Sequence, residues 1–427
     1  MKIKYVHAEE ILDSRGNPTI QTITTLYDGS IGVSATPSGA STGSYEAVEL
    51  RDNDNTRYNG QGVLNAIENV NTLINPALSG LDAQDHGMID KVMLELDGTA
   101  NKANLGANAI LSVSLSVARA QAVSEKKPLY EYLSKFNPDF KGIYTMPIPQ
   151  MNVINGGKHA NWATDIQEYM IMPLKAGSIC NAVRTNVEVY HCLKELIKKK
   201  GYAVTVGDEG GFAPAVESNE EPLILLTEAL SNAKYKSGED IFFAIDPAAS
   251  EFYEDGHYRL NRENKVATSS ELSDFYKNLH RKYPIISMED TFAEDDWSAF
   301  EKFTAEVGSK IQIVGDDLYV TNKTRLQKGI TNKATNCILI KLNQIGTLTE
   351  TIDTVLIAKN SGMGCVVSHR SGETEDTFIA DFAVAMGVGQ IKTGAPARSE
   401  RTSKYNRLMH IERELGNKAV YATFPRY

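Results

Sequence analysis

Acidic and lysine residues close a series of short apolar runs in the second half of the chain. Asp246, Glu289 and Asp316 each follow such a run, and Lys341 and Lys392 close two later ones. Carboxylate oxygens are the ligands that Mg2+ prefers in proteins, and this cation keeps positions for water and substrate oxygens. The pattern therefore predicts metal ligands and ammonium groups that converge on one mouth.

This set of side chains suits removal of a proton next to a carboxylate. Divalent cations nearby favour the neutral form of Lys341, which can then act as a base. The resulting enediolate needs metal stabilisation. Glu209 follows the apolar alternation Tyr202–Val206, which indicates another strand end. A buried carboxyl among others is pushed toward its protonated form and can protonate a leaving β-hydroxyl. The predicted chemistry is a metal-assisted β-elimination of water.

Two further polar segments are candidates for the same site. Gln167 and Glu168 stand just before the apolar stretch Tyr169–Met172, and His159 is at the tip of the glycine-containing loop Asn155–His159. A second glutamate near the mouth suits general acid work. A lone loop histidine is more often solvated than catalytic, so the loop alone leaves both interpretations open.

Two motifs could contact an anionic substrate. Ser38–Gly43 is rich in Gly and Ser but lacks the Gly-Lys-Ser/Thr of a phosphate-binding P-loop. Alone it indicates an ordinary turn rather than a lid. His369, Arg370 and Ser371 offer a guanidinium and a hydroxyl, which favours a phosphate clamp over a surface salt bridge because they follow a strand.

The apolar runs themselves predict the fold that positions these groups. They alternate with helix-length segments, which is typical of βαβ units and a parallel sheet. Six in a row favour a barrel, in which the carboxyl ends of the strands form the active face. Strand ends are also polar simply because loops begin there, but six ends with complementary charges are harder to explain that way. The runs are Ile241–Ile245, Pro284–Met288, Ile311–Gly315, Cys337–Ile340, Cys365–Ser368 and Gly389–Ile391.

Helix signals lie between the predicted strands. Thr268 with Glu271 and Thr347 with Glu350 fit the capping box of a helix start. The second helix is predicted to end near Gly362, where glycine suits a left-handed cap.

The first part of the chain has a different pattern. Strands are predicted at Ile3–Val6, Thr19–Leu26 and Ser30–Ala35, with a turn at Asp28-Gly29. Helices are predicted over residues 63–73, 85–96 and 105–123. A cluster of Pro138, Pro147 and Pro149 marks the boundary, so we predict an α+β domain over residues 1–138 and a barrel domain over 139–427.

Composition narrows the function classes. The chain has 427 residues, 42% hydrophobic residues and a net charge of −10, which argues against nucleic acid as a partner. No apolar stretch is long enough for a membrane span and no signal peptide is evident, so a cytoplasmic enzyme is expected. The four cysteines have no CxxC spacing, which indicates reduced thiols rather than a metal site.

Several long strings resemble the enolase family, of the bacterial type, over nearly the whole length. They are Leu12–Pro18, Ser38–Gly43, Asn155–Gly157, Gly207–Phe212, Leu339–Gln344, Ser368–Asp376 and Lys392–Pro396. The resemblance implies an N-terminal α+β capping domain on an enolase-type β/α (TIM-like) barrel. It also implies the Mg2+-dependent, reversible dehydration of 2-phospho-D-glycerate to phosphoenolpyruvate. The pairing of a lysine base with Mg2+ is a known feature of this superfamily.

The resemblance assigns roles to matching positions. Asp246, Glu289 and Asp316 would hold a first Mg2+, and Ser41 in the lid would help to bind a second with the substrate. Lys341 corresponds to the base at C2.

The acid and the substrate contacts follow in the same way. Glu209 corresponds to the acid with Glu168 in its network, and Lys392 would hold the substrate carboxylate and the enediolate charge. The remaining contacts to the phosphate and their supports would be His159, Arg370, Ser371, His369 and Gln167.

The resemblance also implies a homodimer or an octamer. Asn161-Trp162, Thr291 and Met386-Gly387-Val388 depart from the usual pattern, which puts rate and loop dynamics in question but removes no ligand. An acid-sugar dehydratase or racemase would share the barrel but not the lid.

A different alternative is a surface-displayed adhesin that binds plasminogen. That role often uses C-terminal lysines, whereas the sequence ends in Phe424-Pro425-Arg426-Tyr427, so this feature speaks against that route.

Overall fold

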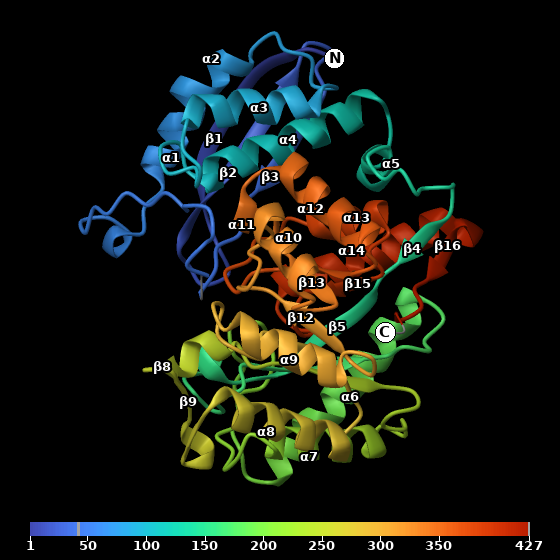
Figure 1. Ribbon diagram of the computed structural model, residues 1–427. Coiled ribbons are helices and arrows are strands. Elements are labelled where there is room, and N and C mark those ends of the chain that lie inside the picture. The colour runs from blue at the N-terminus through green and yellow to red at the C-terminus, as the bar shows by residue number, and fades with distance from the viewer. Residues whose placement is uncertain (41–42, 426–427) are drawn as a thin grey trace.

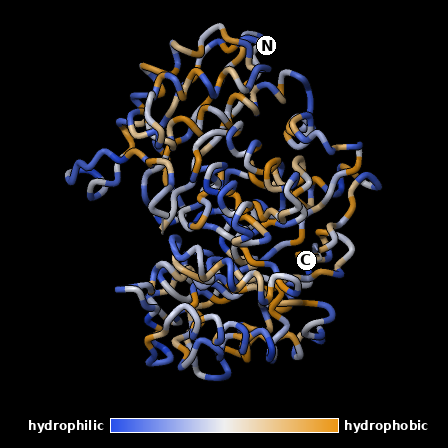
Figure 2. Tube along the Cα trace, in the orientation of Figure 1, coloured by the Kyte–Doolittle hydropathy of each residue, from blue (hydrophilic) through white to orange (hydrophobic). Residues whose placement is uncertain are grey.

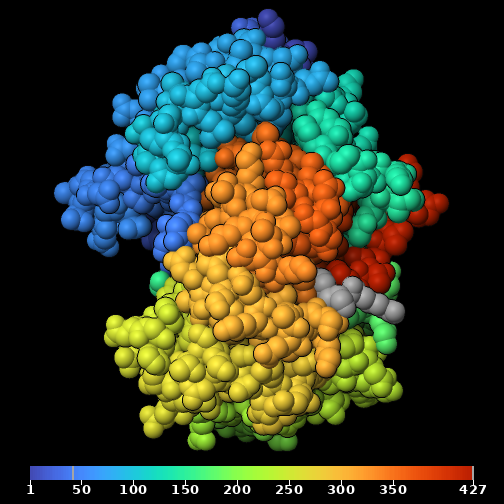
Figure 3. All heavy atoms as spheres, in the orientation of Figure 1, coloured from blue at the N-terminus to red at the C-terminus, as the bar shows by residue number. Residues whose placement is uncertain are grey.

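The computed structural model describes residues 1–40 and 43–425 of the chain. A small sheet with helices, formed by the N-terminal residues, sits on a closed barrel formed by the rest (Figure 1). The space-filling view shows the N-terminal part lying against one end of the barrel (Figure 3). The predicted fold class, a capping domain before a β/α barrel, is confirmed.

The N-terminal sheet is antiparallel with the order β1-β2-β3. β1 spans Ile3–Leu12, β2 Pro18–Leu26 and β3 Ile31–Ala35, so the three predicted strands are present and the first is longer than expected. The turn between β2 and β3 has Gly29 at a φ of 86°, where glycine is free of strain.

Helices cover one face of this sheet. The helix expected over residues 63–73 is instead a short α-helix followed by π-helical turns and a further α-helical turn. The bounds are α1 Leu64–Glu68, the π-helical turns Asn69–Ile74, α2 Asn75–Leu78, α3 His86–Asp97, α4 Ala107–Ser124 and α5 Leu129–Ser134. α4 packs against β2 through buried hydroxyl pairs, Thr22 with Ser112 at 2.6 Å and Thr24 with Ser116 at 2.7 Å.

The close approach of β3 to α4 requires a glycine. A Cβ at Gly32 would lie 2.1 Å from the Ser116 carbonyl oxygen and 2.2 Å from the Ala120 nitrogen. We therefore expect Gly32→Ala to lower the free energy of unfolding by about 3 kcal/mol, the upper part of the range for an over-packed core. Gly87→Ala in α3, where the nearest atom is 4.0 Å away, is the matched control and should stabilise by about 0.5 to 1 kcal/mol. Urea unfolding of both variants measures the difference, and equal midpoints would contradict this packing.

The barrel has eight strands in the closed order β11-β12-β13-β14-β15-β5-β6-β7. Their bounds are β5 Ile148–Asn155, β6 Glu168–Met172, β7 Phe242–Asp246, β11 Ile285–Glu289, β12 Gln312–Gly315, β13 Cys337–Ile340, β14 Gly364–Ser368 and β15 Gln390–Lys392. All six strands predicted from apolar runs are present. Their residues are almost all buried, because helices cover the outside of the barrel (Figure 1).

Two expectations about the barrel were wrong. The sheet is not wholly parallel, since β6 runs antiparallel to both β5 and β7. Residues 202–206 form no strand and make only an isolated bridge between Val206 and Phe212. Glu209 therefore lies in a turn between two helices, not at a strand end.

Nine helices surround or follow the barrel strands in the described part of the chain. They are α6 Ile179–Lys199, α7 Glu221–Asn232, α8 Ser269–Lys282, α9 Trp297–Val307, α10 Lys323–Asn332, α11 Leu342–Ile345, α12 Leu348–Asn360, α13 Phe378–Met386 and α14 Ser399–Leu415. Short strands complete the fold, namely β4 Tyr144–Met146 with β16 Ala419–Tyr421, and β8 Tyr253–Glu254 with β9 His257–Leu260 and β10 Lys265–Ala267.

Of the two predicted capping boxes, the first is confirmed fully and the second in part. Thr268 and Glu271 form the reciprocal capping box of α8. Thr347 accepts the Glu350 N–H at the start of α12, but the Glu350 carboxylate bonds the threonine hydroxyl and pairs with the buried Lys102. Since Lys102 comes from the N-terminal part, this contact ties the two parts together.

A loop before α1 projects from the molecule and is strongly hydrophilic (Figures 1 and 2). Within residues 1–40 and 43–425, none of the helices combines the length and apolar character that crossing a bilayer demands.

Candidate active site

Three neighbouring barrel strands end in the predicted carboxylates. β7 ends at Asp246, β11 at Glu289, and Asp316 follows the last residue of β12. The reversed direction of β6 places its first residue, Glu168, beside Asp246 in the strand register. Parallel strands present their carboxyl ends on one face, and the antiparallel strand adds its amino end to that face. The four acids therefore meet at one mouth.

Lys392, the last residue of β15, is the central cation of this mouth. Its Nζ lies 2.9 Å from Glu168 Oε2, 3.0 Å from Asp246 Oδ2 and 2.8 Å from Glu289 Oε1. Burial lowers the pKa of Lys392, but the carboxylates outweigh burial and hold it well above the usual value. Burial and the Asp246 charge raise the pKa of Glu289 well above its usual range. One ammonium thus faces three buried carboxyl groups.

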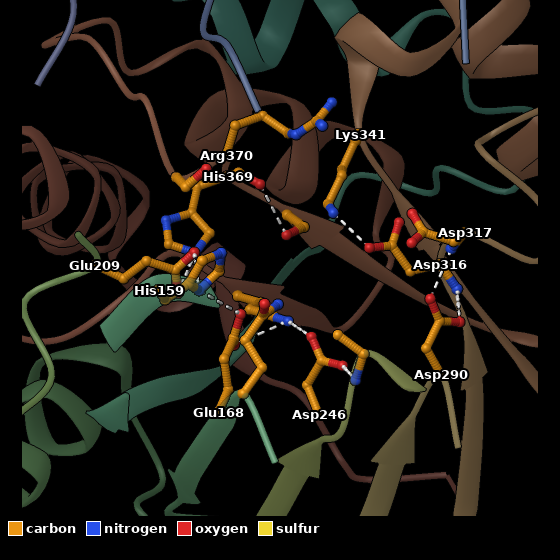
Figure 4. A pocket seen from close by; sticks show the side chains of 15 residues that line it. His159, Glu168, Glu209, Asp246, Asp290, Asp316, Asp317, Lys341, His369 and Arg370 are labelled. Atoms are coloured by element: carbon orange, nitrogen blue, oxygen red, sulfur yellow. Dashed lines mark hydrogen bonds and ion pairs between the residues drawn. The ribbon is translucent and has the colours of Figure 1, made fainter. Parts of the chain in front are cut away.

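Lys341 forms the opposite wall with a second acidic group (Figure 4). Its ammonium contacts the Asp316 carboxylate, which also accepts a hydrogen bond from Gln344 Nε2 at 2.8 Å. Burial lowers the pKa of Lys341, but Asp316 outweighs burial and raises it above the ordinary lysine value.

Two aspartates beside Asp316 escaped the sequence analysis. Asp290 accepts the backbone N–H groups of Asp316 and Asp317, both at 2.8 Å. Oxygens of these three aspartates lie within 4.8 Å of one another, close enough to hold a metal ion together. Burial and the Asp316 charge raise the pKa values of Asp290 and Asp317 well above their usual range. The available signal was the pairing of acids in Glu289-Asp290 and Asp316-Asp317.

The other wall of the pocket carries glutamates and histidines. His159 Nδ1 lies 3.7 Å from Glu168 Oε1 and 3.6 Å from Glu209 Oε1, and His369 Nε2 lies 3.4 Å from Glu209 Oε2. Asn152 donates to Glu209 Oε2 at 2.9 Å. Glu209 and Lys341 therefore face each other across the pocket (Figure 4).

The pKa values of the two glutamates move in opposite directions. Burial and the Glu209 charge raise the pKa of Glu168 well above its usual range. Burial also acts to raise the pKa of Glu209, but the neighbouring His369 and His159 outweigh burial and hold it well below its usual range. The sequence predicted that one buried glutamate of this pair is pushed toward its protonated form, with Glu209 as the acid. The pKa directions show that push for Glu168 and not for Glu209.

The turn that carries Glu209 is held by close backbone packing. Gly210 has a φ of 85°, and a Cβ there would lie 2.8 Å from the Ala397 carbonyl oxygen. The Glu209 carbonyl accepts the Ala395 N–H at 2.9 Å. These contacts position Glu209 without a strand.

Arg370 is held from the N-terminal part. Its guanidinium lies 3.0 and 3.1 Å from the two oxygens of Glu46 and 2.8 Å from Asn343 Oδ1. Ser371 Oγ accepts the Ala40 N–H at 2.6 Å. The segment predicted to clamp phosphate therefore lies at the junction with the capping domain. Sequence reasoning missed Glu46, because no local pattern marks it.

The His159 loop contains two residues in the left-handed region. Asn161 has a φ of 49° and Trp162 a φ of 60°. Arg262 holds the Trp162 carbonyl with hydrogen bonds at 2.6 and 3.2 Å. The atypical Asn161-Trp162 pair therefore sits in a strained turn that is fixed from outside the pocket.

Nearly all predicted site residues meet in this pocket. Its lining includes His159, Gln167, Glu168, Glu209, Asp246, Asp316, Lys341, His369, Arg370, Ser371 and Lys392. Glu289 is not among the lining residues, but its Oε1 lies 2.8 Å from Nζ of the lining residue Lys392. Ser41 lies outside the described residues.

Comparison with family models agrees with this arrangement. Residues 3–133 match the enolase N-terminal domain, and residues 143–425 match the enolase C-terminal TIM barrel domain. Together the two matches cover nearly the whole chain, and they divide it where the capping part meets the barrel. The chain belongs to the enolase family.

Proposed function

We propose that this chain is a glycolytic enolase that interconverts 2-phospho-D-glycerate and phosphoenolpyruvate with Mg2+. The observation that carries the proposal is the position of Lys341, a base candidate, opposite the wall that carries Glu209 and Glu168, the candidate proton donors, in one acidic pocket. Membership of the enolase family supports it. We further propose that the chain is an enolase of the bacterial type and that its domains span residues 1–138 and 139–427. We also propose that it forms a homodimer or an octamer.

The residues fit a divalent cation. Asp246, Glu289 and Asp316 offer only oxygen donors, as Mg2+ prefers. Burial first, and then neighbouring carboxylates, raise the pKa values of Glu289 and Asp290, and a cation bound between these carboxylates would offset their mutual repulsion. We propose that Asp246, Glu289 and Asp316 hold one Mg2+ and that Ser41 contributes to a second. Bound there, the cations would stabilise negative charge on the substrate carboxylate and disfavour the protonated form of Lys341.

The protein groups divide the reaction between them. Lys341 removes the C2 proton of the substrate, and Lys392 holds the substrate carboxylate as its charge increases. Glu209 and Glu168 form the acidic wall, from which a proton reaches the departing hydroxyl at C3. A base and an acid placed on opposite sides suit an elimination, since both transfers occur without rearrangement of the site.

The phosphate contacts come from the junction of the two parts. We propose that Arg370, Ser371 and His159 surround the phosphate, with Gln167 and His369 in support. Arginine suits this role because its planar fork matches phosphate oxygens. In the described structure Glu46 holds that fork in place.

Substrate selectivity tests the proposal against the rest of the superfamily. Purified protein should form phosphoenolpyruvate from 2-phospho-D-glycerate and leave D-glycerate and acid sugars unchanged. Dehydration or racemisation of an acid sugar, with no product from 2-phosphoglycerate, would assign the chain to another branch. Neither family match bears on plasminogen binding.

A metal titration tests the ligand set. Asp316→Asn should weaken Mg2+ binding by roughly 10-fold or more, because a charged oxygen ligand is lost. Isothermal calorimetry of the wild-type protein and of Asp353→Asn, a surface control on α12, gives the comparison. Equal Mg2+ affinity in all three proteins would remove Asp316 from the ligand set.

A further inference from the structure

Arg401 on α14 is a fully buried arginine whose four terminal hydrogens all have acceptors. Nη1 donates to His369 Nδ1 at 2.6 Å and to the Arg370 carbonyl at 2.5 Å. Nη2 donates to the Ser371 carbonyl at 2.5 Å and to the Asp208 carbonyl at 3.1 Å. One guanidinium thus joins both segments that carry the acid wall and the phosphate clamp.

The contact with His369 has a consequence for the imidazole ring. A guanidinium only donates hydrogen bonds and stays charged in proteins. His369 Nδ1 must therefore accept, and an accepting ring nitrogen carries no hydrogen. In the neutral ring the proton then sits on Nε2, which faces Glu209 Oε2 at 3.4 Å.

We propose that Arg401 is a positioning residue that fixes His369 in the Nε2–H tautomer and so directs a hydrogen-bond donor at the Glu209 carboxylate. The consequence for catalysis rests on the proposed function, because only there is Glu209 part of the acid wall. The tautomer itself is independent of any substrate.

The surroundings allow little movement of this pair. A Cβ at Gly394, which has a φ of 77°, would lie 2.9 Å from Arg401 Cδ and 3.1 Å from His369 Cε1. The backbone therefore closes over both side chains. Glycine fits here because its φ is in the left-handed region and because a side chain would meet both groups.

The charges around His369 agree with a neutral ring. Glu209 from the turn before α7, Arg401 from α14 and Lys392 from β15 face it. Burial lowers the pKa of His369 to about 3, and the positive charge of Arg401 acts in the same direction, although Glu209 opposes them. The ring is thus a neutral donor at neutral pH, not an imidazolium.

Nitrogen NMR of the ring tests the tautomer directly. Protein with 15N-labelled histidine is studied by long-range proton–nitrogen correlation at neutral pH, and His369→Gln identifies the His369 signals by their loss. We expect the wild-type ring to show a protonated Nε2 and an unprotonated Nδ1. A protonated Nδ1, alone or in an imidazolium, would overturn the proposal whether or not the arginine variants fold.

Three arginine variants test whether Arg401 sets this state. Arg401→Met should shift His369 toward the Nδ1–H tautomer or a mixture, and Arg401→Lys, which keeps a donor, should retain Nε2–H. Arg413→Met on the exposed side of the same helix is the control. A tautomer unchanged in Arg401→Met, with only a lower unfolding midpoint, would show that Arg401 merely ties the chain together.

Kinetics separates this inference from the proposed function. With 2-phosphoglycerate, Arg401→Met should lower kcat by about 10- to 100-fold, by analogy with the loss when a partner that orients a metal-ligating histidine is removed, with KM little changed. An unchanged kcat in a variant with the shifted tautomer would overturn the catalytic part. No turnover of 2-phosphoglycerate by the wild-type protein would contradict the proposed function but would not affect the result on the tautomer.

Discussion

Lys341→Ala should abolish the exchange of the C2 proton of 2-phosphoglycerate with solvent, whereas Glu209→Gln should keep exchange and lose dehydration. The two side chains lie on opposite walls, so each transfer has its own group. Loss of a general acid or base costs about 10²- to 10⁴-fold. Deuterium incorporation at C2 in D2O, followed by proton NMR, measures the first step. Formation of phosphoenolpyruvate measures the whole reaction.

A control variant and one contradicting outcome make this division of roles testable. The exposed Lys310 is a suitable control, and Lys310→Ala should keep both activities. Loss of exchange in Glu209→Gln as well, in a folded protein that still binds Mg2+, would show that the two walls do not act separately. In that case Glu168, whose pKa is raised by burial and by the charge of Glu209, becomes the first candidate for a shared role.

Lys392→Met should destabilise the protein by about 3 to 5 kcal/mol when metal is chelated, the cost of removing one partner from a buried ion pair. Lys392 Nζ lies within 3.0 Å of an oxygen of each of three carboxyl groups, which lose the cation that they share. Mg2+ should recover part of the loss, because it binds the folded state and replaces positive charge there. Urea unfolding with EDTA and with Mg2+ gives both values.

The stabilising contribution of Lys392 should be lost only at high pH. The pKa of Lys392 is raised in the folded protein, so its contribution is complete below the unfolded value near about 10.4 and is lost only as the pH rises through the folded value. The difference between wild type and Lys392→Met should therefore stay constant with respect to lysine ionisation across neutral pH. Lys198→Met on the exposed end of α6 is the control.

One result would contradict the predicted recovery by metal. It is an equal urea midpoint of Lys392→Met with EDTA and with Mg2+.

The strand ends were predictable because their pattern is local. Each apolar run followed by Asp246, Glu289 or Lys341 is a complete signal in itself, and the barrel brings such ends together. The direction of a strand is not local, since the antiparallel β6 has the same apolar composition as a parallel strand. Residues 202–206 alternate like a strand but pair only at one bridge.

Contacts between distant segments could not be predicted. Glu46 reaches Arg370 from the capping domain, and Arg401 reaches His369 from the last helix. Neither shows a periodic pattern that would place it at the pocket. The charge states also depend on packing, because the pKa values of Glu168 and Glu209 move in opposite directions through their own neighbours.

Formation of phosphoenolpyruvate by the purified protein, with Mg2+ and again after chelation, tests the central claim most directly. We expect turnover of 2-phosphoglycerate with Mg2+, its loss with EDTA, its return when Mg2+ is restored and none from Lys341→Ala. No turnover by folded, Mg2+-loaded wild-type protein, or equal turnover by Lys341→Ala, would contradict the account.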